Sequence, residues 1–371
     1  MIPVYEPITD AQEKEFLLEA LSSGWISGAG PFVERFERSW AEVCQRKCAV
    51  AVTNGTAALD TAFSVLDLPP GSEVIMPDFT LIACLWAVLE NGLRPVFVDA
   101  DPNTWCMDVN RVEESITDST SAILAVHIYG HPVDMDPLLD LAKKYDLAVI
   151  EDAAEAHGAR YKGRICGSFG TVSIFSFYAN KLVTSGEGGM LLCDDEDLAN
   201  RCREYRNMGF GKRCRFKHSS FGKNYRLSNL NAAVGCAQVP KLQLLLEQKL
   251  KVAEIYYNHL EGIPDIQLPS SDSNCLNSYW MYGLVIGASH SLDNFEVIDR
   301  LLARGIGARP FFWGLHEQAL DIPAYSKDSG FGAFPVSERL SRRGLYLPST
   351  PTLTEGQIVE VVDGLKDSLG I

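Results

Sequence analysis

"AILAVHIYGHPVDMDPLLDLAKKYDLAVIEDA" (residues 122–153) is the stretch that decides the fold. Its two ends, residues 122–130 and 147–153, are short apolar runs bounded by polar or turn residues. Residues 135–145, between these runs, have the apolar spacing of a helix. Continuous apolar strands that alternate with helices indicate a parallel sheet whose two faces are both covered.

The same alternation extends towards the N-terminus. Further strands are expected at residues 48–53, 73–77 and 95–100, and helices at residues 56–66 and 81–92. Two more helices precede them, one from Asp10 to Leu21 and one over residues 31–44. The sequence therefore predicts an α/β fold, a doubly wound sheet with helices on both faces.

The pattern changes after about residue 240. Residues 240–262 read as one long amphipathic helix, followed by an apolar run at 279–287 and helices near 294–304 and 355–369. A chain of 371 residues exceeds what one hydrophobic core usually organises. We expect a large domain over residues 1–245, with an N-terminal segment that packs across domains, and a smaller C-terminal α+β domain over residues 246–371.

Charge and cysteine usage exclude several classes of function. The formal net charge of -15 disfavours nucleic acids and membrane surfaces as partners, although local cations and N–H groups could still hold a small anion. The ten cysteines include no CxxC pair, as is typical of free thiols in a reducing compartment. The N-terminus does not resemble a signal peptide, and no apolar stretch reaches membrane-spanning length. We therefore expect a soluble, cytoplasmic protein.

Two segments at the ends of predicted strands carry candidate ligand-binding groups. Asn54, Gly55 and Thr56, in "VTNGTAAL" (52–59), lie where a helix N-terminus would favour a phosphate, although an ordinary capped turn would look the same. Asp152, in "VIEDAAEAHG" (149–158), could hold a ribose hydroxyl, a metal or a protonated ring nitrogen, or it could cap a helix. The acids and histidine nearby have no recognised ligand spacing, so we predict no metal site.

A single lysine defines the third segment, "FSFYANKLVTSGEGGM" (175–190). A buried Lys181 would tend to lose its proton, and a neutral amine forms Schiff bases with carbonyls. The alternative is a surface lysine whose stem covers apolar side chains. Ser176, five residues earlier, could reach a phosphate. An amine, a carboxylate and an anion site together fit pyridoxal 5'-phosphate (PLP).

The motifs of the whole chain resemble one family. They are "GWISGAG", "TNGTAALDTAF", "EVIMPDFT", "VHIYGHPVDMDP", "EDAAEAHGA", "FSFYANKLVTSGEGGM", "NYRLSNLNAAVG" and "ARPFFWGLHEQ". With them the chain resembles the sugar-nucleotide aminotransferases of the DegT/DnrJ/StrS group. The resemblance implies a fold-type-I PLP-dependent transferase, with a mostly parallel seven-stranded sheet between helices.

The resemblance also implies roles for individual residues. Lys181 matches the Schiff-base lysine, and Asp152 matches the partner of the pyridine nitrogen. Asn54 is a predicted cofactor contact at the helix N-terminus, and the resemblance gives as phosphate contacts Gly55, Thr56 and Ser176, joined by Asn224 from a second subunit. The last of these implies a homodimer with shared sites, and a tetramer is also possible.

Two further cofactor contacts are implied by the resemblance, and Leu81 departs from the family pattern. Glu155 occupies the place beside the cofactor's phenolic oxygen where many relatives have glutamine. Leu81 stands where relatives carry an aromatic residue on the cofactor ring. Glu155, the "FSF..NK" pattern and "YWMY" (279–282) resemble most the GDP-perosamine synthase branch.

The implied activity is a two-stage transamination. L-Glutamate would give its amino group to the cofactor, forming pyridoxamine phosphate, and a nucleotide-linked 4-keto-6-deoxy sugar would then accept it. The best match is GDP-4-keto-6-deoxy-D-mannose, converted to GDP-perosamine for O-antigen or another surface glycan. A UDP- or dTDP-linked sugar and amination at C3 or C4 stay open.

Candidate substrate contacts are less sharply defined, because each also has a structural interpretation. They are Trp25, Ser27, Gly28, Tyr129, Arg226, Tyr279, Arg309 and His316. His127 and His157 are expected to be structural.

Three alternative classes are disfavoured. Related PLP-dependent sugar 3-dehydratases carry histidine in place of the lysine, so Lys181 argues against that activity. A regulatory relative would need a DNA-reading module, which this acidic sequence does not offer. A Rossmann dehydrogenase would need a G-x-G-x-x-G motif after the first strand, and none is there.

Overall fold

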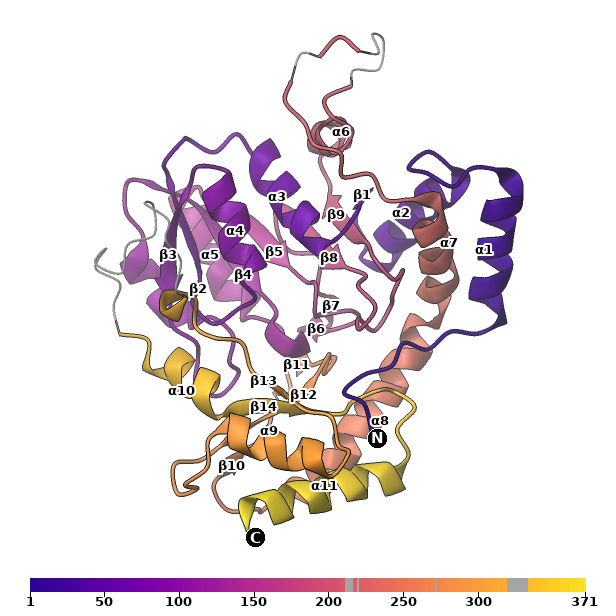
Figure 1. The fold of residues 1–371 in the computed structure, drawn as a ribbon. Coiled ribbons are helices and arrows are strands. Elements are labelled where there is room, and N and C mark those ends of the chain that lie inside the picture. Colours follow the sequence, from indigo (N-terminus) through magenta and orange to yellow (C-terminus); the bar gives the residue numbers. More distant parts are fainter. Residues whose placement is uncertain (211–215, 219, 271, 319–332) are drawn as a thin grey trace.

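A seven-stranded sheet forms the centre of the larger part of the molecule (Figure 1). The computed structural model describes residues 1–210, 216–218, 220–270, 272–318 and 333–371. In spatial order the strands are β1 (Cys48–Val52), β9 (Gly189–Cys193), β8 (Val172–Ser176), β5 (Ala148–Asp152), β4 (Thr120–Val126), β2 (Glu73–Pro77) and β3 (Arg94–Val98). Only β9 runs antiparallel to its neighbours in this sheet, so the predicted mostly parallel sheet is confirmed.

Helices cover both faces of this sheet, as expected from strands that are apolar on both sides. One face packs against α3 (Gly55–Val65), α4 (Ala83–Glu90) and α6 (Glu196–Tyr205). The other face packs against α2 (Pro31–Val43), α5 (Met135–Tyr145) and α7 (Asn229–Gln238), and α1 (Ala11–Ser23) lies against α7. The strand–helix–strand unit read at residues 122–153 is therefore present as β4, α5 and β5.

A second, smaller sheet lies in the C-terminal part of the chain. Its antiparallel strands are β10 (Ile266–Gln267), β12 (Tyr282–Ile286), β14 (Gly344–Leu347) and β13 (Arg309–Pro310). Around it lie α8 (Leu242–Leu260), α9 (Asn294–Ala303), α10 (Pro335–Arg343) and α11 (Glu355–Leu369). A short sheet of β11 (Cys275–Leu276), β6 (Arg160–Tyr161) and β7 (Arg164–Ile165) joins segments from both halves of the sequence.

The N-terminal segment lies against this C-terminal part. Ile2 forms a parallel bridge with Ile306, and the carbonyl of Val4 accepts a hydrogen bond from the N–H of Ser349. The predicted domain boundary, between residues 245 and 246, falls inside α8. The division into two domains at this point stays a prediction.

Several predicted element ends are wrong, and the reasons are local. The strand expected over 122–130 ends at Val126, because the chain turns there and Tyr129 has a φ of 51°. The strand expected from residue 279 begins at Tyr282, because Tyr279 has a φ of 48°. β9, α6, α7 and α10 were not predicted at all. For β9 the glycines that precede it indicated only a turn.

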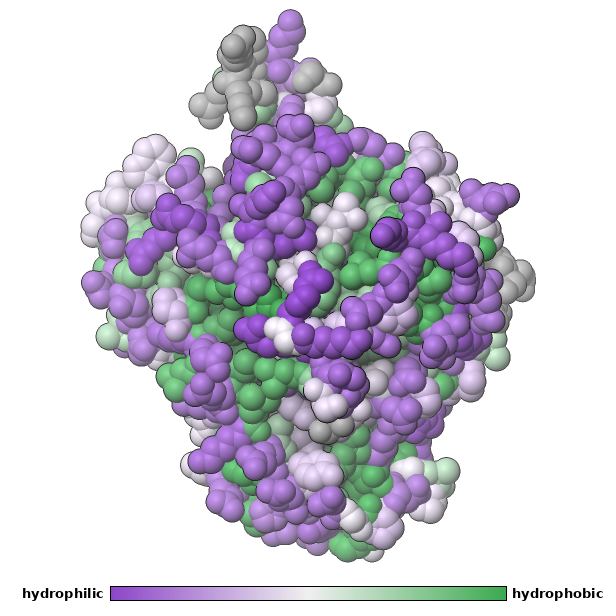
Figure 2. Space-filling model, turned by 180° about the vertical axis from the view of Figure 1, so that it is seen from behind, coloured by the Kyte–Doolittle hydropathy of each residue, from purple (hydrophilic) through white to green (hydrophobic). Residues whose placement is uncertain are grey.

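One face of the molecular surface shows how polar and apolar residues are distributed. Seen from behind, hydrophilic residues dominate the surface, with smaller hydrophobic areas between them (Figure 2). Within the described residues, the helices are too short or too polar to cross a membrane.

Candidate active site

The predicted cofactor residues gather around one cavity of about 470 Å³. It lies at the carboxyl edge of the large sheet, where ligands bind in open α/β folds. Eight of the nine predicted cofactor contacts line it, namely Asn54, Gly55, Thr56, Leu81, Asp152, Glu155, Ser176 and Lys181. Residues from β1, β5 and β8 are brought together because these strands end at the same edge.

One part of the cavity lining offers groups that suit an anion. Asn54 caps α3 by accepting a hydrogen bond from the N–H of Ala57 at 2.8 Å. The first N–H groups of a helix have no acceptor within it, so those of Gly55 and Thr56 are available to a ligand. A Cβ at Gly55 would lie 2.9 Å from the Cβ of Ser176. Glycine therefore lets the helix N-terminus and the serine lie close enough to share one phosphate.

A buried carboxyl group lies at the end of β5. Asp152 accepts hydrogen bonds from the N–H of Ala154 at 2.9 Å and from the thiol of Cys84 at 3.4 Å. Burial raises the pKa of Asp152, while those two donors and the Lys181 amine act in the opposite direction. Such a carboxyl group is suited to share a proton with a ring nitrogen.

The Lys181 side chain is also buried, with 7% of the residue exposed. Its Nζ lies 4.0 Å from Oε1 of Glu155 and 3.6 Å from the centre of the Trp280 ring. Burial lowers the pKa of Lys181, and the charges of Glu155 and Asp152 act against that shift. The amine is therefore closer to its neutral, nucleophilic form than a surface lysine would be.

Glu155 completes this group of charges. Its Oε2 accepts a hydrogen bond from the N–H of Tyr129 at 2.7 Å. Burial raises the pKa of Glu155 to about 7, although Lys181 and the Tyr129 N–H act to lower it. Glu155 can therefore gain or lose a proton near neutral pH.

These groups fit PLP. The cavity offers an amine, a buried acid and helix N–H donors, the three features that this cofactor needs. The buried Oδ1 of Asn180, which also lines the cavity, has no hydrogen-bond partner among the described residues. It can accept a hydrogen bond from a bound ligand.

The remaining predicted residues are not among those that line the cavity. Asn224 is exposed and forms a bridge with Asn207. Arg226 donates to Oδ1 of Asn207 at 2.8 Å, and its side chain packs against Gly28. Ser27 accepts a hydrogen bond from the N–H of Asn229 through its carbonyl.

Four other predicted substrate contacts also lie outside the lining of this cavity. Trp25 is 57% exposed, and Arg309 is exposed in β13. Tyr129 is buried and its hydroxyl accepts a hydrogen bond from the N–H of Phe312, while Tyr279 stacks on Tyr282. Their roles in substrate binding stay predictions.

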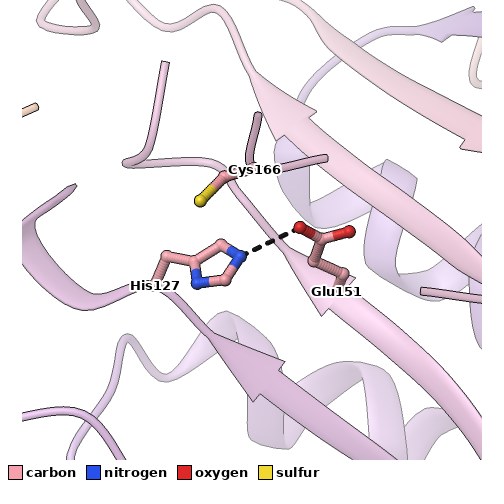
Figure 3. Close-up of side chains that lie close together, drawn as sticks. All are labelled: His127, Glu151 and Cys166. Carbon is pink, nitrogen blue, oxygen red and sulfur yellow. Dashed lines mark hydrogen bonds and ion pairs between the residues drawn. The ribbon is translucent and has the colours of Figure 1, made fainter. Parts of the chain in front are cut away.

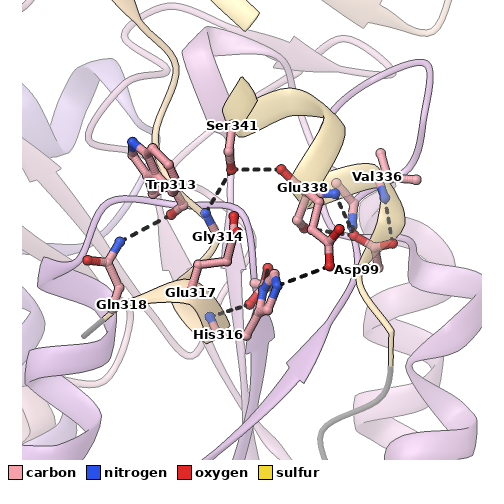
Figure 4. A network of polar contacts seen from close by, with 12 residues as sticks. Asp99, Trp313, Gly314, His316, Glu317, Gln318, Val336, Glu338 and Ser341 are labelled. Carbon is pink, nitrogen blue, oxygen red and sulfur yellow. Dashed lines mark hydrogen bonds and ion pairs between the residues drawn. The ribbon is translucent and has the colours of Figure 1, made fainter. Parts of the chain in front are cut away.

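His316 belongs to a polar network between the two parts of the molecule (Figure 4). Its Nδ1 lies 2.7 Å from Oδ2 of Asp78, just after β2, and its Nε2 lies 3.6 Å from Glu338 of α10. Burial acts to lower the pKa of His316, but the hydrogen bond and charge of Asp78 outweigh it and raise the pKa. In this arrangement His316 ties the C-terminal part to the large sheet.

His127, Glu151 and Cys166 lie together, but their bonding does not suit a metal (Figure 3). Glu151 accepts hydrogen bonds from His127 at 3.0 Å and from Ser173 at 2.7 Å, and His127 accepts another from Val133. Burial raises the pKa of the Cys166 thiol, which therefore stays protonated, whereas metals bind thiolates. The cluster is structural, as expected for His127.

His157 is also structural. Its Nδ1 accepts a hydrogen bond from the N–H of Val183 at 3.2 Å, and its ring packs on Trp40 and Phe175. Burial lowers the pKa of His157 to about 3, so the ring is neutral.

The sequence did not reveal several other residues that line the cavity. They are Thr80, Cys84, Tyr178, Asn180, Glu187, Trp280, Phe312 and Tyr346. Trp280, Phe312 and Tyr346 come from the C-terminal part of the chain, far from the strand-end motifs. Cys84 and Asn180 could have been suspected, since they lie in or beside those motifs.

Comparison with known proteins identifies the class of enzyme. The model of the DegT/DnrJ/EryC1/StrS aminotransferase family matches residues 7–366. The GDP-perosamine synthase of Escherichia coli O157:H7 is 37% identical over 99% of this chain and 98% of its own. That of Caulobacter vibrioides is 38% identical over 99% and 98%. The crystal structure of DesV from S. venezuelae superposes with a TM-score of 0.88 and 35% identity, covering 96% and 94% of the two chains.

The fold and the cavity are those of a PLP-dependent aminotransferase. The chain belongs to the DegT/DnrJ/EryC1/StrS aminotransferase family. Its substrates are accordingly a keto sugar and an amino donor.

Proposed function

We propose that this aminotransferase transfers the amino group of L-glutamate to GDP-4-keto-6-deoxy-D-mannose, giving GDP-perosamine for O-antigen or another surface glycan. Two relatives that match this chain along its whole length are GDP-perosamine synthases, and their identities of 37% and 38% support the choice of sugar. The observation that carries the chemistry is the buried Lys181 amine beside Asp152 and Glu155, in a cavity that is also lined by the N-terminus of α3.

Each group has a role in this reaction. When bound, PLP supplies an electron sink for the substrate carbon. Lys181 would hold it covalently, and Gly55, Thr56 and Ser176 would hold its phosphate. Asp152 would keep a proton at the ring nitrogen. The Nζ of Lys181, close to neutral because it is buried, would move the proton at the reacting carbon.

We further propose a homodimer in which Asn224 reaches the partner's site. Exposed apolar side chains on α1 and just after it support an interface at this helix. They are Leu18, Leu21, Trp25 and Ile26. Sedimentation of the purified protein tests this proposal, and a monomer at all concentrations would contradict it.

We also propose a cytoplasmic location, which is supported by the free thiols of the described cysteines.

The deciding experiment offers the PLP-loaded protein L-glutamate and a panel of GDP-, UDP- and dTDP-linked 4-keto-6-deoxy sugars. Release of 2-oxoglutarate is followed, and the aminated sugar is identified by mass spectrometry and NMR. We expect turnover with the GDP-linked sugar and amination at C4. Turnover only with another nucleotide would overturn the specificity, and none with any sugar would overturn the proposed substrate class.

Lys181→Ala serves as the control for the chemistry. It should lose turnover, and borohydride should no longer fix PLP to the peptide that contains residue 181. A variant that still forms this link would contradict the role of Lys181.

A further inference from the structure

Trp280 contacts the Lys181 amine directly, although the two residues are distant in the sequence. Lys181 lies in the loop between β8 and β9, and Trp280 lies just before β12 in the C-terminal part. The Nζ of Lys181 lies 3.6 Å from the centre of the Trp280 ring, over its face. A cation at this distance is attracted by the negative face of an aromatic ring, and tryptophan provides the strongest such attraction.

The same indole also holds the backbone that carries the lysine. Its Nε1–H donates a hydrogen bond to the carbonyl of Asn180 at 2.9 Å. The carbonyl of Lys181 itself accepts a hydrogen bond from the hydroxyl of Tyr5 at 3.2 Å. Both carbonyls are thus fixed by side chains from other segments, and Trp280 fixes backbone and amine together.

Three titratable groups lie around the amine in addition to this ring. Asp152 and Glu155, on and after β5, favour the charged ammonium, and a protonated His157 would oppose it. Burial of the site favours the neutral amine. The contact with the Trp280 ring acts in the same direction as the two carboxylates, towards the ammonium and against burial.

We infer that Trp280 is a positioning residue for Lys181, whose ring holds the ammonium form of the amine while its N–H fixes the adjoining backbone. Trp280 thereby sets the pH range over which Lys181 carries a proton. The importance of this role for catalysis rests on the proposed function of Lys181. The contact itself does not depend on that function.

The test measures the protonation of Lys181 in the full-length protein freed of cofactor. Competitive acetylation across a pH series, read by peptide mass spectrometry, gives the pKa and reactivity of each lysine. Trp280→Leu removes both the ring and the N–H, and we expect the pKa of Lys181 to fall by about one unit. Trp280→Phe keeps a weaker aromatic face, so we expect roughly half that shift.

Trp313→Leu is the matched control, since Trp313 is partly exposed and does not line the cavity. The exposed Lys251 is the internal reference in every sample. The pKa of Lys181 should be the same in Trp313→Leu as in the wild type. The reactivity of Lys251 should be the same in every variant. Partial recovery of the Lys181 pKa in Trp280→Phe distinguishes an aromatic contact from simple filling of space.

An unchanged Lys181 pKa in a folded Trp280→Leu protein would overturn the inference. If that variant does not fold, Trp280→Phe decides, and a Lys181 pKa equal to that of the wild type would overturn it. Because cofactor and sugar are absent, this result is independent of the substrate panel. Failure of the proposed function would appear in the turnover of the wild-type protein, either as turnover only with another nucleotide or as no turnover with any sugar.

Discussion

The Nζ of Lys181 lies 4.0 Å from Oε1 of Glu155, and both side chains are buried. Burial alone would leave both groups uncharged, since it lowers the pKa of Lys181 and raises that of Glu155. Their mutual attraction opposes both shifts. The pair is therefore balanced between a neutral and an ionic form, which suits an amine that must both take up and release a proton.

Glu155→Gln tests this balance, because it removes the ionisable group and keeps an acceptor for the N–H of Tyr129. With a pKa of about 7 against an ordinary 4.5, folded Glu155 holds a proton that the unfolded chain has released. The free energy of unfolding of the wild type, relative to that of the variant, should therefore fall as the pH rises from about 4.5 to 7. Urea unfolding of the cofactor-free proteins at several pH values measures this difference.

Glu254→Gln provides the control, because Glu254 is an exposed carboxyl group on α8. This variant and the wild type should show the same pH dependence. A Glu155→Gln protein whose stability also follows the wild type at every pH would contradict the raised pKa of Glu155.

Gly55→Ala should weaken PLP binding at least about tenfold, or by about 1.4 kcal/mol. The new methyl group would lie 2.9 Å from the Cβ of Ser176, whereas carbon atoms pack at about 3.5–4.0 Å. The N-terminus of α3 or the serine must then move, and both are predicted phosphate contacts. Titration of the cofactor-free protein with PLP, followed by absorbance, gives the affinity.

Gly356→Ala makes the same change in α11, where an added Cβ meets nothing within 4 Å. It should leave PLP affinity unchanged and raise stability by up to about 1 kcal/mol. Equal affinities for the wild type and Gly55→Ala would show that the phosphate does not bind at this helix.

His316→Asn should destabilise the protein mainly at low pH. The raised pKa of His316 means that its ion pair with Asp78 contributes fully below the ordinary pKa of 6.5 and is lost as the pH rises through the folded value. We expect a loss of about 1 kcal/mol in acid, since the histidine is partly exposed, and less above neutral pH. The pH dependence of the unfolding midpoint measures it.

The same substitution in an Asp78→Asn background isolates the pair. There the pH-dependent part of the loss should disappear. If it persists, the nearby Glu317 and Glu338, and not Asp78, are the partners that stabilise the charged histidine.

The sequence predicted those parts of the site that lie in continuous segments. Gly55 and Lys181 follow strands of the large sheet and Asp152 ends another, and the carboxyl ends of parallel strands meet at one edge. Trp280 reaches the same cavity from a segment that is 99 residues (280 − 181) beyond Lys181. Its place depends on how the smaller sheet packs against the larger one, and periodicity within a segment does not specify that packing.

Predicted element ends failed for a related reason. The apolar run through residue 130 continues past the end of β4, because Ile128 and Tyr129 are buried in a turn and not in a strand. A loop residue that is buried by tertiary contacts is apolar, like a residue of a buried strand. The sequence alone therefore does not distinguish the two.

Lys249 gives the last prediction, because it is buried and has no carboxylate partner among the residues that the structure describes. Its Nζ donates to the carbonyl and to the hydroxyl of Ser349, and burial lowers the pKa of Lys249 well below its ordinary 10.5. The folded protein thus binds fewer protons here than the unfolded chain, so this lysine makes stability rise with pH. Lys249→Met removes that slope and leaves the Ser349 carbonyl unpaired, which costs about 1–3 kcal/mol at alkaline pH.

The cost of the Lys249→Met substitution should shrink as the pH falls, because the wild type must then either bury an ammonium or keep a neutral amine that the unfolded chain would protonate. Urea unfolding across the pH range measures the difference, and Lys251→Met, at an exposed position two residues further along α8, should show none of it. A difference that grows in acid would mean that Lys249 is charged in the folded protein.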